Sequence, residues 1–285
     1  MPRIAYVNGR YLPYAEATVH IDDRGYQFAD GVYEVIHVRD GHLVDADPHF
    51  GRFEYSLGEL RIKPPMARAP LRLVLGELLI RNEIENGLLY FQATRGVAPR
   101  DHKFPAKSRT SLVATAKRLR AMPAAAMARG VSVISIPDIR WQRCDIKSLS
   151  LLPNILGKQH AVEQGAYEAW QVDASGFVTE GTSTNAWIVT AGRRLVTRPL
   201  SHAILAGIVR RSVVGMMDGL EVTFEQRPFS LAEARDAREA FLTSSSGFLI
   251  PVTTLDGQPV GDGKVGPLTQ ELRRRMDAYV TGGQA

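Results

Sequence analysis

Apolar residues along the first 120 positions follow two periods, and together these predict a sheet covered by helices. The segments AYV-NG-RYL and VIHV-RDG-HLV each place a turn between two apolar stretches, which predicts two hairpins. In PHFGRFEYSLGEL, residues 48–60, the apolar residues recur every three or four positions, and APLRLVLGELLIRNEI, residues 69–84, continues in the same way, so both predict helices. GLLYFQATRG and TSLVATAKRL predict strands. This half of the chain is therefore expected to be α+β.

The remainder of the chain alternates shorter apolar strands with helical patterns. We expect an N-terminal α+β domain at residues 1–120, a linker at residues 121–127 and a C-terminal domain at residues 128–285, because RLRAMPAAAMARG places small residues around a proline. In the C-terminal domain the patterns predict strands at VSVISIP, EAWQV, NAWIV, EVTFEQ and EAFLTSS, and helices at LPNILGKQHAVEQG, ILAGIVRRSVVGMMDGL, SLAEARDA and PLTQELRRRMDAYV.

The composition is that of an ordinary folded enzyme. The 285 residues are 45% hydrophobic and 23% charged, and no apolar run is long enough to cross a membrane. The net charge of +5 comes from dispersed arginines, so a nucleic-acid-binding protein is an alternative that only the pI near 9.4 supports. The single cysteine, Cys144, excludes an intrachain disulfide and gives no metal-binding spacing. We therefore expect a cytoplasmic protein with no metal site and no membrane or nucleic-acid partner.

One lysine stands in an otherwise apolar run. The stretch RCDIKSLSLLP, residues 143–153, places Lys147 among isoleucine and leucines. Removing an ammonium group from water is costly unless the group is paired or loses its proton. Lys147 is therefore either a partly exposed strand end whose amine reaches water, or a desolvated amine that forms a Schiff base with a carbonyl cofactor. The residues of this stretch leave both readings open.

Two further segments carry candidate chemistry. VTEGTSTN, residues 178–185, places Glu180 before a glycine and several hydroxyls, and AFLTSSSGFLIP, residues 240–251, runs a strand into consecutive hydroxyls. Each segment taken alone is ordinary turn chemistry. Amide-rich turns and the N-terminus of a helix such as LAGIVRR also bind phosphate groups. A reactive lysine, an acid for a pyridine nitrogen and two anion-binding turns are together what pyridoxal phosphate requires.

At this point the sequence resembles a known family. The segments DDRGYQFADGVYEV, QATRGVAPRDHKFP, DIRWQRCDIKSLSLL, VTEGTSTN and DGKVG occur in the order found in class IV pyridoxal-phosphate aminotransferases, most closely the D-amino acid aminotransferases. The resemblance runs through nearly the whole chain. It implies an α+β, two-domain fold of type IV, with the cofactor between a smaller N-terminal domain and a larger C-terminal domain.

The resemblance also implies roles for individual residues. Lys147 would form the covalent link to pyridoxal 5'-phosphate and move a proton between the substrate carbon and the cofactor, while Glu180 would keep the pyridine nitrogen protonated. Arg52, in HFGRFEYS, matches the family's phosphate-binding arginine, and Leu205 would pack against the ring. The other phosphate contacts would be the backbone amides of Ile208 and Val209 and the hydroxyls of Ser245 and Ser246.

The substrate end rests on a loop bounded by prolines, PRDHKFP. Its Arg100 and His102, with Tyr33, match the residues that hold the substrate α-carboxylate in the D-amino acid enzymes, where this loop reaches across from the partner subunit. The resemblance therefore implies a homodimer. Two departures from the family pattern bear on affinity: Val209 lacks the hydroxyl usual at the phosphate, and Asp101 brings a carboxylate beside the anion site.

The expected activity is transamination between a D-amino acid, such as D-alanine or D-glutamate, and a 2-oxo acid, such as 2-oxoglutarate or pyruvate. The same fold also supports an (R)-selective amine transaminase, a branched-chain aminotransferase or an aminodeoxychorismate lyase. Arg100 and His102 favour the D-amino acid activity, because an amine without a carboxylate gives them nothing to bind.

Overall fold

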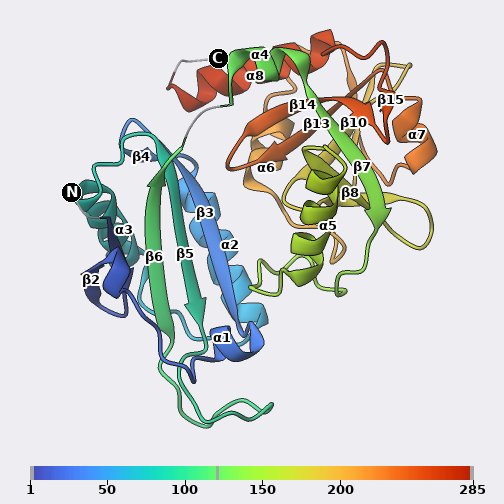
Figure 1. Cartoon of the computed structure of the whole chain (residues 1–285). Coiled ribbons are helices and arrows are strands. Elements are labelled where there is room, and N and C mark those ends of the chain that lie inside the picture. The colour runs from blue at the N-terminus through green and yellow to red at the C-terminus, as the bar shows by residue number, and fades with distance from the viewer. Residues whose placement is uncertain (1–2, 120–121, 283–285) are drawn as a thin grey trace. The chain divides into compact units, whose positions relative to one another are not determined.

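The computed structural model describes residues 3–119 and 122–282. The chain divides into two compact units: unit 1 consists of Met1–Arg120 with Ile146–Ser150, and unit 2 consists of Ala121–Asp145 with Leu151–Ala285 (Figure 1). The short segment 146–150, which the sequence places inside the expected C-terminal domain, thus belongs to unit 1. Residue 121 of the expected linker lies outside the described residues. The last residues of the linker, 124–127, form the start of helix α4 (Ala124–Arg129).

Unit 1 is built on a six-stranded antiparallel sheet with the order β2-β1-β6-β5-β3-β4. Both predicted hairpins are confirmed. In the first, Asn8 and Gly9 have φ values of 48° and 96°, which are the left-handed conformations that a tight two-residue hairpin turn requires. The strands are β1 (Ile4–Val7), β2 (Arg10–Pro13), β3 (Gly31–Arg39), β4 (His42–Leu43), β5 (Gly87–Thr94) and β6 (Ser111–Arg118).

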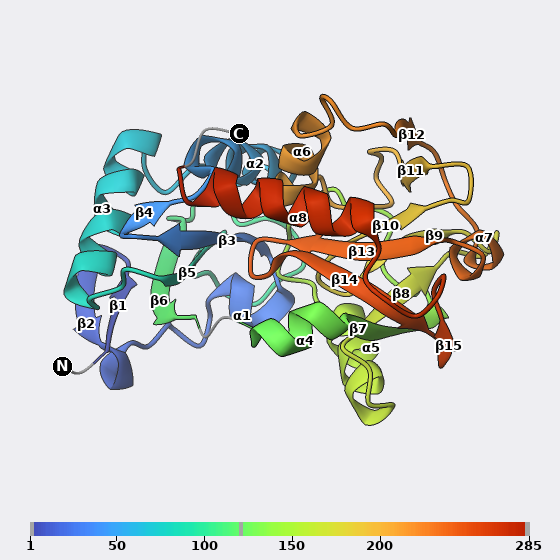
Figure 2. The same cartoon turned by 90° about the horizontal axis from the view of Figure 1, so that it is seen from above.

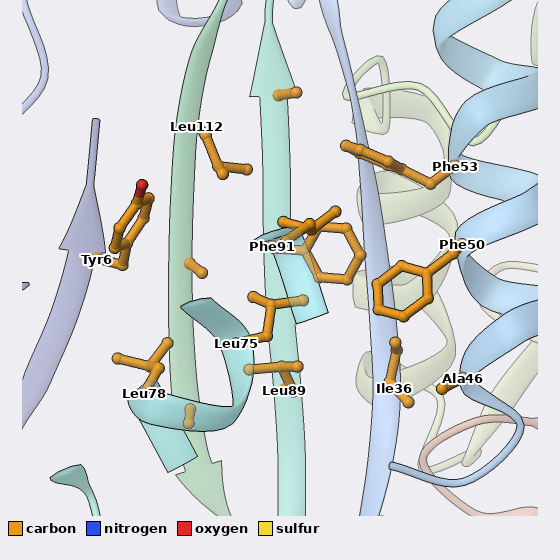
Figure 3. Close-up of a cluster of buried hydrophobic side chains, with 14 of the residues drawn as sticks. Tyr6, Ile36, Ala46, Phe50, Phe53, Leu75, Leu78, Leu89, Phe91 and Leu112 are labelled. Carbon is orange, nitrogen blue, oxygen red and sulfur yellow. The ribbon is translucent and has the colours of Figure 1, made fainter. Parts of the chain in front are cut away.

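Two helices cover one face of this sheet. They are α2 (Ala46–Glu59) and α3 (Arg68–Arg81), as the periodicity predicts, and unit 1 also contains α1 (Arg24–Phe28) and a 3-10 turn at Tyr14–Glu16. Figure 3 shows Phe50 and Phe53 of α2 pointing toward Phe91 of β5. The ring centres of Phe53 and Phe91 are 4.9 Å apart, and both side chains are almost completely buried. The apolar stripe of each helix therefore packs on the apolar face of the sheet.

Unit 2 contains a nine-stranded mixed sheet, in which β15 lies off the main path β12-β11-β10-β13-β14-β7-β8-β9. Successive residues of a strand face opposite sides of this sheet. Trp187 of β10 and Phe241 of β13 pack with α6 and α8, whereas their neighbours Ala186 and Leu242 pack on the other side. Figure 2 shows α8 running alongside β13.

The elements of unit 2 are β7 (Val131–Pro137), α5 (Leu152–Glu163), β8 (Glu168–Val172), β9 (Val178–Gly181), β10 (Asn185–Val189), β11 (Arg194–Thr197), α6 (Ile208–Gly215), β12 (Thr223–Gln226), α7 (Leu231–Arg235), β13 (Glu239–Ser244), β14 (Phe248–Leu255), β15 (Gln258–Pro259) and α8 (Pro267–Val280).

The helix predicted at residues 204–220 is shorter than its pattern suggests. α6 begins only at Ile208, because the amide of Leu205 donates to the Glu180 carboxylate instead of entering a helix. The apolar residues that precede Ile208 therefore form a loop beside β9. The other helices predicted in this half, α5, α7 and α8, are confirmed within one or two residues at each end.

Within residues 3–119 and 122–282, no helix combines the length and the apolar character needed to span a membrane. Over the same residues, no cluster of three or more His, Cys, Asp or Glu side chains is arranged to bind a metal ion.

The core of unit 1 allows a matched test on one helix. Leu75→Ala should lower the free energy of unfolding by about 2–5 kcal/mol, because it removes a fully buried side chain and leaves a cavity. Leu73→Ala, two residues away in α3 with its side chain 75% exposed, should change it by about 0.5 kcal/mol or less. Guanidinium chloride denaturation followed by circular dichroism measures both. Equal midpoints for the two variants would contradict the packing of α3.

Candidate active site

The backbone around Lys147 is fixed from two sides within unit 1. Ser148 forms an antiparallel bridge with Val32 at an edge of β3, and the amide of Tyr33 donates to the Lys147 carbonyl over 3.0 Å. The amide of Lys147 in turn donates to the Ser56 hydroxyl of α2 over 3.1 Å. The backbone of the lysine is therefore held by a strand and a helix, while the residue itself is half-buried, so both readings of Lys147 stay open.

A glycine, Gly31, stands at the start of β3, where β5 and the segment after Lys147 both come close to the strand. A Cβ atom at Gly31 would lie 2.6 Å from the Ala93 carbonyl oxygen and 2.8 Å from Cδ1 of Leu149. Any other residue here would clash with the backbone of β5 at Ala93, whereas the end of the Leu149 side chain could move aside. The amide of Leu149 donates to the Gly31 carbonyl over 3.0 Å, which fixes the register of the lysine against β3.

The lysine amine lies over an aromatic surface. Lys147 Nζ is 4.2 Å from the centre of the Tyr33 ring, which stacks on Tyr90 with a centre separation of 5.6 Å. The Tyr90 hydroxyl donates to Oε1 of Gln92 over 2.7 Å, and burial raises the pKa of Tyr90 to about 12. The lysine thus faces neutral rings rather than a carboxylate. The structure brings together two of the residues predicted for the site, Lys147 and Tyr33.

The residue after Tyr33 points to the opposite face of the sheet and carries a buried charge cluster. Glu34 accepts hydrogen bonds from Nε and Nη2 of Arg52 over 2.7 and 2.8 Å, and it lies 2.7 Å from Nδ1 of His49. Burial opposes ionisation of Glu34, but the Arg52 guanidinium and His49 outweigh it and lower the pKa of Glu34 to about 2. Arg52 is thus held by two parallel hydrogen bonds, and its contact with a phosphate stays a prediction.

In unit 2, Glu180 is the centre of a network of donors. Its carboxylate is paired with the Arg140 guanidinium, and it accepts from Nδ2 of Asn185 over 3.0 Å and from the Leu205 amide over 3.1 Å. Burial raises the pKa of Glu180, against the lowering influence of Arg140 and the Leu205 amide. Arg140 is shared, because Asp138 also binds it over 2.7 Å. Arg140 lies in the DIRWQRCDIKSLSLL segment, but it was not among the predicted site residues.

The start of α6 presents backbone amides. Gly207 is the N-cap and no side chain caps the helix, so the first amides, those of Ile208 and Val209, have no partner within the helix. A Cβ atom at Gly207 would lie 2.0 Å from Oδ1 of Asn185, so only glycine lets this helix start pack against the residue that binds Glu180. The amides and the positive end of the helix dipole suit an anion. Val209 supplies an amide there and no hydroxyl.

The predicted serines lie next to this group. Asn185 pairs with Thr243 in the β10–β13 ladder, so the end of β10 beside Glu180 adjoins the end of β13 that leads into the turn containing Ser245 and Ser246. Ser246 Oγ lies 3.3 Å from the Ser244 hydroxyl. Unit 2 thus contains the predicted acid and all the predicted phosphate contacts except Arg52. A carboxylate acceptor fits a protonated ring nitrogen, and amide and hydroxyl donors fit a phosphate.

The hydroxyls that follow Glu180 serve a different carboxylate. Glu168 of β8 is fully buried and accepts from the hydroxyls of Thr182, Ser183 and Thr184, the last two over 3.0 and 3.3 Å. These residues therefore stabilise the turn after β9 through Glu168, which the sequence signals as a charged residue at the start of an apolar strand.

The predicted substrate loop lies between β5 and β6 and is exposed. The guanidinium carbon of Arg100 is 4.5 Å from the centre of the Phe28 ring, and the His102 ring centre is 5.6 Å from it, so both residues meet on one aromatic side chain. Asp101 turns its carboxylate toward Lys103, 3.2 Å away, which offsets its negative charge. Within the described part of unit 1, no contact joins this pair to Lys147 or Tyr33.

Comparison with known proteins gives consistent results. Residues 31–255 match the family described as amino-transferase class IV. The chain is 38% identical over 275 residues to the D-alanine aminotransferase of Staphylococcus haemolyticus, covering 96% of this chain and 97% of the relative. It is 40% identical over 269 residues to the D-alanine aminotransferase of Bacillus licheniformis, covering 94% of each. The structure of the branched-chain amino acid aminotransferase from Escherichia coli has a TM-score of 0.89 at 20% identity, covers 100% of this chain and 96% of that chain, and confirms the expected fold.

The Glu34 cluster predicts a specific dependence of stability on pH. Glu34→Gln should lower the free energy of unfolding at pH 7 by about 3–5 kcal/mol, because it removes the carboxylate of a buried ion pair. The folded pKa of about 2 lies below the ordinary value of 4.5, so the stabilisation is fully present above pH 4.5 and is lost as the pH falls toward 2. Denaturant titrations between pH 2 and 7 should show this loss in the parent and less of it in the variant.

Glu54→Gln is the matched control on the same helix. Glu54 is exposed and pairs with Arg68 at the surface, so its replacement should cost about 0–1 kcal/mol at pH 7. If both variants lost the same free energy, Glu34 would not hold a buried ion pair.

Proposed function

The chain belongs to the class IV aminotransferases, and on that premise we propose that it exchanges an amino group between a D-amino acid, such as D-alanine or D-glutamate, and a 2-oxo acid, such as 2-oxoglutarate or pyruvate. The observation that carries the proposal is the identity with D-alanine aminotransferases over almost the whole chain. The branched-chain enzymes of similar structure share the fold at lower identity, and they add no argument about the substrate.

The cofactor is pyridoxal 5'-phosphate, which supplies an aldehyde that takes up the amino group and a ring that accepts electrons from the substrate carbon. Lys147 is the proposed covalent attachment point, and its Nζ moves the proton to and from the substrate α-carbon. Its backbone is held by β3 and α2, so the amine is positioned before substrate binds. The neighbouring Tyr33 and Tyr90 rings give it a surface with little competing charge.

The other contacts of the cofactor are proposed on each unit separately. Glu180 holds the proton on the pyridine nitrogen, and its three donors keep the carboxylate in place for that task. The phosphate is bound by the amides of Ile208 and Val209 and by the hydroxyls of Ser245 and Ser246, with Arg52 as the cation and Leu205 against the ring. For Arg52 the proposal rests on the family resemblance, and its observed hydrogen bonds to Glu34 orient the guanidinium.

Arg100 and His102 bind the substrate α-carboxylate in this proposal, together with Tyr33. Arginine suits this task because its planar guanidinium donates two parallel hydrogen bonds to a carboxylate. Since the family resemblance implies that this loop reaches across from the partner subunit, we propose that it serves the partner's site in a homodimer. The cytoplasmic location belongs to the same proposal and is supported by the one free cysteine.

The first test of the function compares two enantiomers and two lysines. The purified protein, loaded with cofactor, should form pyruvate from D-alanine and 2-oxoglutarate, and much less from L-alanine. Lys147→Ala should lower this rate by at least about 100-fold, since it removes the group that moves the proton. After borohydride reduction, peptide mass mapping should find the pyridoxyl group on Lys147.

Lys158→Ala is the control, because Lys158 contacts the Tyr167 carbonyl and ring and has no proposed role in the chemistry. Its rate should stay within about twofold of the parent's, a change of roughly 0.4 kcal/mol in activation free energy. A pyridoxyl group on Lys158, or pyruvate formed faster from L-alanine than from D-alanine, would contradict the proposal.

The second test concerns the carboxylate. Arg100→Ala should lower kcat/KM for D-alanine roughly 10- to 150-fold, because a hydrogen bond to a charged group contributes about 1.5–3 kcal/mol. The half-reaction with an (R)-amine that lacks a carboxylate, followed by absorbance, should change little. The contrast between the two substrates separates loss of binding from a folding defect.

Lys107→Ala removes a positive charge from the same loop and serves as the control. Its side chain is exposed and has no proposed role in the site, so kcat/KM for D-alanine should stay close to that of the parent. Equal losses in Arg100→Ala and Lys107→Ala would mean that general positive charge attracts the substrate, without a specific contact from Arg100.

A further inference from the structure

The loop that carries Arg100 and His102 is held by a buried arginine. Arg24, the first residue of α1, is only 3% exposed. Its Nη1 donates over 2.6 Å to the carbonyl of Asp101, the residue between Arg100 and His102. Its Nε donates over 2.7 Å to Oδ2 of Asp30. One guanidinium therefore joins the tip of an exposed loop to the interior of unit 1.

The aromatic ring of Phe28 lies under the same loop. The guanidinium carbon of Arg24 is 4.8 Å from the ring centre, that of Arg100 is 4.5 Å from it, and the His102 ring centre is 5.6 Å away. A cation over the face of an aromatic ring is attracted by the ring's negative face, so Phe28 gives Arg100 a preferred resting place. The two side chains proposed to bind the carboxylate thus rest on one ring.

The residues that hold Arg24 are themselves fixed by hydrogen bonds and close packing. Asp30 also accepts from Nε and Nη2 of Arg95 over 2.7 and 2.9 Å, and Arg95 Nη2 donates to the Leu60 carbonyl over 2.8 Å. A Cβ atom at Gly25 would lie 2.1 Å from Cγ2 of Thr94, so α1 lies directly against β5. Arg24 is therefore fixed at its backbone and at its guanidinium, whereas the loop above it is exposed.

We propose that Arg24 and Phe28 are positioning residues of the substrate carboxylate site, a role that rests on the function proposed above for Arg100 and His102. An exposed loop with two long side chains loses conformational freedom when it binds a ligand, and contacts that order it beforehand reduce that loss. Arg24 fixes the backbone between the two residues, and Phe28 fixes their side chains. Neither residue touches the substrate in this arrangement, so both act on substrate affinity through the loop.

The test uses the holoenzyme and separates KM from kcat. In Arg24→Met and in Phe28→Leu, KM for D-alanine and, in the reverse direction, for pyruvate should rise about tenfold, which corresponds to about 1.4 kcal/mol of binding. The kcat at saturating substrate and the cofactor retained on dialysis should stay at the parent's level. In Arg24→Met the buried Asp30 keeps both hydrogen bonds from Arg95, so its charge remains compensated.

Two further variants control for folding and for charge. Phe28→Tyr keeps the ring and should restore KM to within about twofold of the parent's, a difference of roughly 0.4 kcal/mol. Arg61→Met removes a guanidinium that lies over Phe104 of the same loop at 4.9 Å, away from the Phe28 ring on which Arg100 and His102 rest, so its KM should equal the parent's.

The outcomes decide between the two proposals. An unchanged KM in Phe28→Leu, or a fall in kcat and cofactor retention as large as the change in KM, would overturn the positioning role. If Arg24→Met does not fold, Phe28→Leu against Phe28→Tyr decides alone. A parent enzyme that makes no keto product from any D-amino acid would instead refute the proposed function itself, which the same assay reports before any variant is compared.

Discussion

The pairing of residues 146–150 with an edge of β3 is the contact on which the rest of the candidate site depends. The residues on either side of segment 146–150 belong to unit 2, but the bridge between Ser148 and Val32 makes Lys147 part of unit 1. Because alternate residues of a strand face opposite sides, this register places Tyr33 under the lysine amine and Glu34 on the far face with Arg52. A shift of one residue would exchange these two environments, putting the lysine beside a charge cluster.

Two buried glutamates show how the same side chain acquires different properties. Glu34 is buried, but it accepts hydrogen bonds from Nε and Nη2 of Arg52, and its pKa falls to about 2. Burial raises the pKa of Glu180, and Asp138, which shares Arg140 with it and carries a charge of the same sign, adds to this rise. Glu34 is therefore an ionised carboxylate with a structural role. Glu180 is a carboxylate for which one more positive donor would be favourable, which is what a protonated ring nitrogen supplies.

Much of the fold was predictable from the sequence because it follows from local patterns. The turn at Asn8-Gly9 and the periodic stripes of α2 and α3 are specified by residues within a few positions of one another. The edge pairing of Lys147, the partnership of Arg140 with Glu180 and the late start of α6 each join residues that lie far apart in the chain or depend on such a contact. Periodicity carries no information about these contacts. Lys147 and Glu180 were predicted as a functional pair from their residue types and then from the resemblance to a family.

The support of the substrate loop illustrates why such residues escape a reading of the sequence. Arg24 stands in the polar segment DRGYQF and has the appearance of a surface arginine, yet it is buried and donates to a backbone carbonyl. A contact to the main chain does not depend on which side chain the loop carries at that position. The same contact makes Asp101 compatible with the proposed anion site, because Arg24 holds its carbonyl while its carboxylate turns toward Lys103. The positions of Arg100 and His102 are thereby set by the backbone and by Phe28, and the charge between them is offset at the surface.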